Sequence, residues 1–325
     1  MKAYKAKCKW AITAFMLMFV MGICLPDSSH AVAVSEKGKS WKIRLDGNFI
    51  YDDNVVASPD NSSVKPAGLG QESDEGFEWN GAASYDFKFN KKFKYGVDYD
   101  INQIVYDDLD QYNLISQIFG TGGTYKINPL THLQLNYKFI YNILDGDNFS
   151  GSQYISPSFN YMSKKYGLTR LDFTFKYTDN YQADTRDKNQ YAFGITQYML
   201  FANYTRRVSL SYKYTLDDAS GPAFDRDFHT IALKGQTPLP WDMKLVGKGK
   251  WIITDYDSFL TQATDLREDT KQQYYVKLSK LLLKKWNWMN DLTLAVKYKY
   301  TFNDSNLTVR EYQSNRVTVG LAARF

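Results

Sequence analysis

The chain has 325 residues, a formal net charge of +5 and 44% apolar residues. Its mean hydropathy of −0.47 excludes a helical membrane protein, which needs repeated runs of about 20 apolar residues. Aromatic residues make up 16% of the chain, which excludes a disordered protein. The classes that remain are rich in β-structure, because aromatic residues are enriched in strands and at membrane interfaces.

The amino terminus has the layout of a secretory signal peptide. Four lysines precede an apolar run over residues 10–25, and small residues ending at Ala31 follow it. We therefore expect residues 1–31 to be a cleaved signal peptide, residues 32–40 a short periplasmic segment and residues 41–325 the mature domain. The alternative is a retained membrane anchor, for which the apolar run is short.

Both cysteines of the chain, Cys8 and Cys24, lie in this segment, so the mature chain folds without disulfides. Lipidation at Cys24 is disfavoured, because Ile23 stands where the lipobox has a small residue. Removing the four lysines and one aspartate of residues 1–31 leaves a net charge of +2. This near-neutral charge argues against nucleic acid as a partner.

The mature chain alternates apolar and polar residues, the pattern of strands with one apolar face. The first segment, residues 41–51, shows the alternation with one exception, the apolar Ile50 on its polar face. The same rule predicts about fourteen strands, at residues 41–51, 77–89, 93–101, 112–126, 132–142, 152–162, 168–178, 189–200, 207–216, 228–236, 243–254, 270–280, 291–302 and 315–325.

The connections between these segments alternate in length. Short links are expected at residues 90–92, 128–131, 163–167, 202–206, 237–242 and 281–290, and longer polar links at 52–75, 107–111, 142–151, 179–188, 217–227, 254–269 and 303–314. Short periplasmic turns, long external loops and an even strand number are typical of outer-membrane barrels. The sequence therefore predicts an all-β fold, a single antiparallel up-and-down transmembrane β-barrel in the bacterial outer membrane, in contact with its lipids.

A soluble two-sheet sandwich is the alternative, and it explains neither the alternating links nor the aromatic residues near the short turns. Those aromatic residues are Trp41, Phe89, Phe93, Phe201, Trp241, Trp286, Trp288 and Phe325, and they predict an interfacial girdle. The chain ends with apolar residues at alternate positions, Val317, Val319, Leu321, Ala323 and Phe325. This ending is similar to the signature that the barrel assembly machinery reads, so that machinery is an expected partner.

Four stretches resemble the carboxyl-terminal barrel of the surface lipoprotein assembly modifier family. They are the strand end 51–55, the stretches 219–225 and 238–241, and the ending from Tyr300 to Phe325. Members of that family carry a helical repeat domain before the barrel and are implicated in delivering lipoproteins to the cell surface. Here about nine residues separate the expected cleavage site from the first strand. The resemblance thus implies a role in surface-lipoprotein assembly together with a separate periplasmic repeat protein or a surface lipoprotein as partner.

The polar face of each strand must point into the lumen, and its charges are unevenly distributed. Later strands contribute a basic arc, Lys213, Lys244, Lys248, Lys250, Lys271, Lys277, Lys297 and Lys299. The first three strands contribute an acidic arc, Asp46, Glu78, Asp86, Asp98 and Asp100. Facing arcs would create a transverse field that favours anionic or polar solutes. The alternative is that these groups pair across the lumen and fill it.

No motif for catalysis, cofactor or metal is recognised, so we expect a protein that is not an enzyme and has no cofactor. His229 beside Asp225 and Asp227 is a weak candidate for a general base. The acidic stretches 107–110 and 145–148 are weak candidates for calcium ligands, because neither fits the full calcium-loop pattern.

The favoured function is a porin-like channel for small polar or anionic solutes, because fourteen strands lie between a filled barrel of eight and a porin of sixteen. The competing function is an export or assembly component that works with a separate periplasmic partner. A structural or adhesive barrel is a third class, in which the lumen would be closed.

Overall fold

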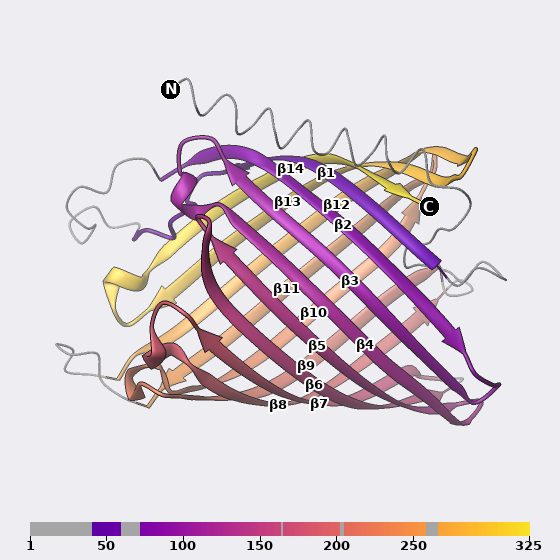
Figure 1. Cartoon of the computed structure of the whole chain (residues 1–325), viewed down its shortest axis with the longest axis horizontal. Coiled ribbons are helices and arrows are strands. Elements are labelled where there is room, and N and C mark those ends of the chain that lie inside the picture. Colours follow the sequence, from indigo (N-terminus) through magenta and orange to yellow (C-terminus); the bar gives the residue numbers. More distant parts are fainter. Residues whose placement is uncertain (1–40, 60–71, 164, 202–204, 258–265) are drawn as a thin grey trace.

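The computed structural model describes residues 41–59, 72–163, 165–201, 205–257 and 266–325, so the expected signal peptide and residues 32–40 lie outside the described residues. In the described part the chain forms one closed antiparallel barrel, in which every strand pairs with its sequence neighbours and β1 pairs with β14 (Figure 1). The fourteen-strand up-and-down barrel predicted from the sequence is confirmed.

The strands are β1 (Trp41–Asp52), β2 (Asp74–Lys88), β3 (Phe93–Tyr106), β4 (Leu114–Asn128), β5 (Thr131–Leu144), β6 (Asp147–Ser163), β7 (Gly167–Asn180), β8 (Lys188–Phe201), β9 (Arg206–Ala219), β10 (Arg226–Leu239), β11 (Met243–Tyr256), β12 (Glu268–Trp286), β13 (Met289–Ser305) and β14 (Tyr312–Arg324). Each is longer than the 9–11 residues that a tilted strand needs to cross a bilayer. No helix in the described part of the chain is long and apolar enough to cross a membrane.

The two ends of the barrel differ. The turn end, at the right of Figure 1, holds the tight connections, such as Asn287-Trp288 between β12 and β13. The loop end, at the left, holds longer connections and four short 3-10 helices, η2 (Asp110–Tyr112), η3 (Asp184–Arg186), η4 (Pro222–Phe224) and η5 (Thr308–Arg310).

One predicted long link is wrong. Residues 142–151 were expected to form an external loop, but β5 and β6 continue through them and are joined by Asp145 and Gly146 alone. Both residues have positive φ, 52° and 86°. This is the backbone of a two-residue hairpin turn, for which Asp-Gly is a preferred sequence. The polarity of the segment therefore reflects turn chemistry and strand ends rather than loop length.

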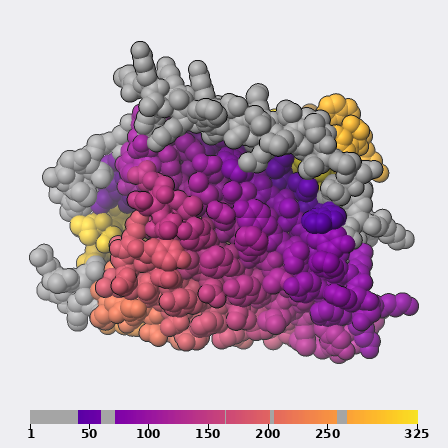
Figure 2. Space-filling model, viewed as in Figure 1, coloured from indigo at the N-terminus to yellow at the C-terminus, as the bar shows by residue number. Residues whose placement is uncertain are grey.

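The wall follows the period-two pattern. On β1 the side chains of Phe49 and Tyr51 are 68% and 50% exposed, whereas Asp46 and Asn48 on the opposite face are 7% and 2% exposed. The outer face is thus apolar and the inner face polar, as a barrel in lipid requires. The outer side chains of β2 to β8 form one continuous surface (Figure 2).

The girdle residues lie at the turn end, and three of them are among the most exposed aromatic side chains of the described barrel. Trp241, Phe89 and Trp286 are 78%, 66% and 65% exposed. Phe325 differs from them, being 4% exposed and stacked on Trp288 with ring centroids 4.6 Å apart.

Candidate functional site

The lumen is the candidate functional site, and the strand register decides which side chains reach it. Pairing relates Lys42 of β1 to Ser84 of β2, and Ser84 to Asp98 of β3, so these three share the inner face. The same alternation continues around the barrel. All residues of the basic arc and the acidic arc have inward register positions.

The lysines of the basic arc form no ion pairs with the carboxylates that the structure describes. Among the described residues, none of the eight has an Asp or Glu oxygen within 4.0 Å. Lys271 donates to the hydroxyl of Tyr312 at 2.6 Å, and Lys297 donates to Oδ1 of Asn48 at 3.1 Å. Four other lysines act electrostatically on Lys250, namely Lys213, Lys248, Lys271 and Lys299. The eight lysines thus form no ion pair with a described carboxylate, although Asp46 acts on Lys277 and Asp52 on Lys299 over a longer distance.

Several of these cations lie directly opposite one another on adjacent strands. In the strand register Lys234 lies opposite Lys248, Lys277 lies opposite Lys297, and Lys299 lies opposite Arg316. Like charges at directly opposed positions destabilise a sheet. Arg316 also lies 3.7 Å from Glu78 and 4.0 Å from Asp52, so ion pairs explain its presence. No such ion pair is found among the described residues for Lys234, Lys248, Lys277 or Lys297, so folding alone gives no reason for the charge at these four positions. Sequence reasoning omitted Lys234 and Arg316 from the basic arc, although both fall on the inward positions of their strands.

The acids of the acidic arc are mostly paired along the wall. Asp46 pairs with Arg44 and Asp86 with Lys42. Glu78 lies 3.7 Å from Arg316, and Asp98 lies 3.8 Å from Lys138. Asp100 alone of the five has no cation within 4.0 Å among the described residues. Every partner is on the same strand or on one at most two strands away, so four of the five acids are compensated locally.

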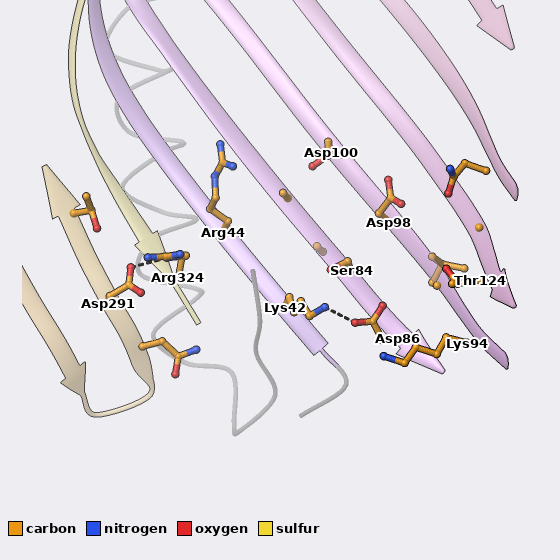
Figure 3. A pocket seen from close by; sticks show the side chains of 18 of the residues that line it. Lys42, Arg44, Ser84, Asp86, Lys94, Asp98, Asp100, Thr124, Asp291 and Arg324 are labelled. Atoms are coloured by element: carbon orange, nitrogen blue, oxygen red, sulfur yellow. Dashed lines mark hydrogen bonds and ion pairs between the residues drawn. The ribbon is translucent and has the colours of Figure 1, made fainter. Parts of the chain in front are cut away.

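A cavity of about 1020 Å³ occupies the turn end of the lumen. Its lining comes from β1 to β5 on one side and from β12 to β14 with Lys244 on the other, so it spans the barrel interior. Figure 3 shows Arg44, Asp98 and Asp100 beside the Lys42–Asp86 and Arg324–Asp291 pairs. Cations outnumber acids in this lining, which makes the cavity suited to anionic or polar groups.

An apolar cluster lies at the loop end of the barrel, on the side of β1 and β3. Ile50, Tyr106 and Leu109 are 3%, 6% and 7% exposed, and Val55 and Val56 pack against them. Ile50, the exception on the polar face of β1, is explained by this cluster. The chain leaving β1 thus folds over the β1–β3 side of the lumen.

The stretch 51–55 at the end of β1 joins the chain that follows β1 to the barrel. Asn54 is 8% exposed and donates through Nδ2 to the carbonyl oxygens of Ser58 at 3.0 Å and Gln313 at 2.9 Å. Asp52 accepts a hydrogen bond from the Ser314 hydroxyl at 2.9 Å. Two of the four stretches that carried the family resemblance, 51–55 and the ending from Tyr300 to Phe325, therefore meet where β1, its following loop and β14 are joined.

The carboxyl-terminal signature lies on the outer face of β14. Val317, Val319 and Leu321 are 40%, 41% and 45% exposed, whereas Ala323 is 3% exposed. The Phe325 amide donates to the Ile43 carbonyl oxygen at 3.0 Å, so the last residue extends the pairing between β14 and β1. Recognition by the assembly machinery remains a prediction.

The weak catalytic and metal candidates are not brought into a site. His229 has an outward register position and accepts or donates a 2.8 Å hydrogen bond with the Tyr212 hydroxyl, while Asp225 accepts the Ala219 amide at 2.6 Å. Within the described residues there is no group of three or more His, Cys, Asp or Glu side chains placed to hold a metal ion.

The closed barrel with an apolar outer wall and a polar lumen defines a transmembrane β-barrel of the bacterial outer membrane. Sequence comparison identifies its family, because the profile of the surface lipoprotein assembly modifier matches residues 41–325. The chain belongs to this family. The turn end accordingly faces the periplasm. None of the curated proteins compared with the chain matches it.

Solved structures agree with the fold. The outer membrane channel DcaP of Acinetobacter baumannii has a TM-score of 0.54 and 12% sequence identity, over 91% of this chain and 100% of that one. A FadL homologue from Pseudomonas aeruginosa has a TM-score of 0.50 and 8% identity, over 88% and 90% of the two chains. At these identities the similarity concerns the fold alone.

Proposed function

We propose that this barrel acts in the assembly of surface lipoproteins, as the membrane-embedded part of that process. The observation that carries the proposal is the extent of the family match, which runs from the first residue of β1 to the last residue of the chain. Because the match coincides with the barrel, the barrel itself is what the chain shares with the family.

The cavity at the turn end of the lumen, which faces the periplasm, supports this role. Its volume of about 1020 Å³ lies at the upper limit of ordinary ligand pockets, which are about 300–1,000 Å³. A cavity of this size accommodates a short extended segment of a polypeptide and excludes a folded domain. A lipoprotein that is handled by this barrel would therefore engage it with a segment, and a separate periplasmic protein would hold the rest.

Surface exposure of lipoproteins tests the proposal. Lipoproteins of the native host are labelled with an alkyne fatty acid, and intact cells are treated with a protease. We expect the fraction of labelled protein removed by the protease to fall when the gene is deleted and to return with the wild-type gene. An unchanged fraction in the deletion strain would refute the role in assembly.

A second function, porin-like passage of small anions, is favoured by the opposed cations of the lumen. At three places on neighbouring strands, cations lie directly opposite each other, which lowers the stability of the barrel. A channel that attracts anions needs positive charges in its lumen, which would account for their presence. Single-channel recording in a planar bilayer tests it with the purified mature barrel.

The informative variant is Lys248→Glu/Lys250→Glu/Lys297→Glu. We expect a stable conductance that prefers anions in the wild type and loses that preference in the variant. Absence of conductance from a barrel that shows heat-modifiable gel migration would reject the channel while leaving the assembly role intact.

A further inference from the structure

Four lysines form a basic patch on the lumen side of the wall, where β2, β3 and β4 reach the turn end. They are Lys88, Lys92, Lys94 and Lys126, all exposed, and we call them the mouth lysines. Lys88 lies directly opposite Lys94 in the register of β2 and β3. The Lys126 amide donates to the Lys92 carbonyl oxygen at 2.8 Å, so these two residues also lie opposite each other.

The register places the mouth lysines on the inner face of the wall. Lys88 lies two residues beyond Asp86 on β2, so it shares the face of the acidic arc. Lys94 lies opposite Lys88 on one side and opposite Thr124 on the other, and Lys126 lies two residues beyond Thr124. Lys88 and Lys94 also line the cavity of about 1020 Å³. The patch therefore belongs to the periplasmic mouth of the lumen.

The mouth lysines form no ion pairs within the part of the chain that the structure describes. Each is more than 4.0 Å from every described Asp and Glu oxygen. Asp86 lies diagonally across from Lys94, but its carboxylate is bound by Lys42. Like charges at opposed positions lower the stability of a sheet. Folding alone thus gives no reason for these four charges, whereas an anionic ligand would.

The opposite side of the cavity is also basic. Lys244 of β11 and Lys284 of β12 line it, and neither forms an ion pair with a described carboxylate. Lys284 lies opposite Asp291 in the register, but the Asp291 carboxylate accepts a hydrogen bond at 2.7 Å from an arginine of β14. Two lining acids, Asp100 and Asp242, also form no ion pair among the described residues, and the unpaired lysines of the lining outnumber them.

The extent of this basic surface indicates a ligand with several negative charges. The mouth lysines spread over three neighbouring strands, which is about 10 Å at about 4.8 Å between strands. Lys244 and Lys284 place further positive charge on the far side of the cavity. One carboxylate or phosphate group is too small to meet all of these cations, whereas an extended peptide segment with several carboxylates fits both the charge and the volume.

We propose that the periplasmic mouth of the lumen binds an acidic segment of a surface lipoprotein, whose carboxylates pair with the mouth lysines. The proposal rests on the proposed assembly function, because that function supplies the polypeptide, and it gives the segment a chemical class. Bound carboxylates would also relieve the repulsion between the opposed lysines, which accounts for their position.

Fluorescence anisotropy tests binding with the purified mature barrel in a neutral detergent. The probe is a dye-labelled peptide of alternating glutamate and serine, and the variant is Lys88→Gln/Lys94→Gln. The matched control, Arg206→Gln/Lys280→Gln, removes two exposed cations of the same end that lie opposite Phe201 and Met243 on the outer face. We expect the first variant to bind about fivefold more weakly than the wild type and the control to bind like the wild type. Equal affinities of the two variants would overturn the proposal.

Competition identifies the class of ligand. Free glutamate at the same carboxylate concentration, inorganic phosphate and phosphatidylglycerol in the micelles are each added to the peptide complex. We expect the unlabelled peptide to displace the probe far better than any of the three. Equal displacement by glutamate or phosphate would indicate a site for small anions, and equal displacement by phosphatidylglycerol a site for lipid headgroups. Either result would overturn the proposal.

Urea unfolding separates binding from a purely structural role. Lys88→Gln/Lys94→Gln removes a like-charge pair, so we expect its unfolding midpoint to equal or exceed that of the wild type. A lower midpoint would show that these lysines serve the fold and would overturn the proposal.

The protease assay of lipoprotein exposure distinguishes this proposal from the assembly function itself. In the deletion strain we expect Lys88→Gln/Lys94→Gln to restore less exposure than Arg206→Gln/Lys280→Gln. Full restoration by both variants would reject the acidic segment and retain the assembly function. Exposure that does not depend on the gene at all would reject the assembly function, whatever the peptide affinity.

Discussion

Asp53 and Asn315 form three hydrogen bonds with each other across the seam where β1 meets β14. The Asp53 carboxylate accepts the Asn315 amide at 2.6 Å through Oδ1 and the Asn315 side-chain Nδ2 at 2.8 Å through Oδ2. The Asp53 amide in turn donates to the Asn315 carbonyl oxygen at 3.1 Å. Barrel closure joins residues 262 positions apart, and this pair binds them at the loop end of the seam.

Replacing Asp53 tests its contribution to closure. Asp53→Ala removes two charge-assisted hydrogen bonds, and we expect the free energy of unfolding to fall by about 2 kcal/mol. Urea unfolding in detergent measures it. The control is Asp218→Asn, an exposed aspartate near the same rim, for which a change within about 0.5 kcal/mol is expected. Equal stabilities of the two variants would show that the pair does not hold the seam.

Two glycines with positive φ make a matched comparison. At Gly167, φ is 81° and an added Cβ would lie 2.0 Å from the Tyr198 carbonyl oxygen, whereas at Gly146, φ is 86° and nothing lies within 4 Å. We expect Gly146→Ala to lower the free energy of unfolding by about 1–2 kcal/mol, the cost of a left-handed alanine. Gly167→Ala should cost more, because backbone must move to relieve the clash. The same urea experiment compares them, and an equal loss would contradict this account.

Pro157 interrupts the hydrogen-bond ladder between β6 and β7. The pairing passes from Ile155 with Phe175 to Ser158 with Asp172, without the two positions between them. Proline has no amide hydrogen to donate, so this ladder lacks a bond. We expect Pro157→Val to restore it, with a gain of about 1 kcal/mol and slower exchange of the neighbouring amide hydrogens. Faster exchange or lower stability in the variant would show that the interruption is needed for the shape of the wall.

The pairing of the acidic arc predicts the effect of removing acids. Asp46→Asn/Asp86→Asn frees Arg44 and Lys42 from their carboxylates. If the barrel conducts ions, its anion-to-cation permeability ratio should rise in this variant, as measured by reversal potentials in asymmetric KCl. Asp218→Asn again serves as the control, because it lies outside the lumen. A ratio that falls or stays constant would show that the paired acids do not compensate the field.

Much of the architecture was predictable from sequence, because membrane strands obey a period of two. A single rule assigned an inward position to Lys248 and an outward one to Phe49. The same rule predicted a long loop around Asp145-Gly146, where the structure has a two-residue turn. The prediction was wrong because a polar tight turn between polar strand ends has the same composition as a loop.

The functional interpretation depended on relationships that no local pattern contains. The alternation identified basic and acidic arcs, but only the register shows that Asp86 has Lys42 as its partner while Lys277 faces Lys297. Which residues face each other on different strands depends on the stagger of the sheet, and the sequence pattern of a single strand does not contain that stagger.

The sequence by itself thus determined the fold class, the strand number and the face of each residue, because these follow from side-chain alternation in a lipid environment. Only the tertiary structure decided which charges are compensated and how Asp53 and Asn315 close the seam. Each of these depends on distances between strands far apart in the chain, and those distances exist only once the barrel has closed.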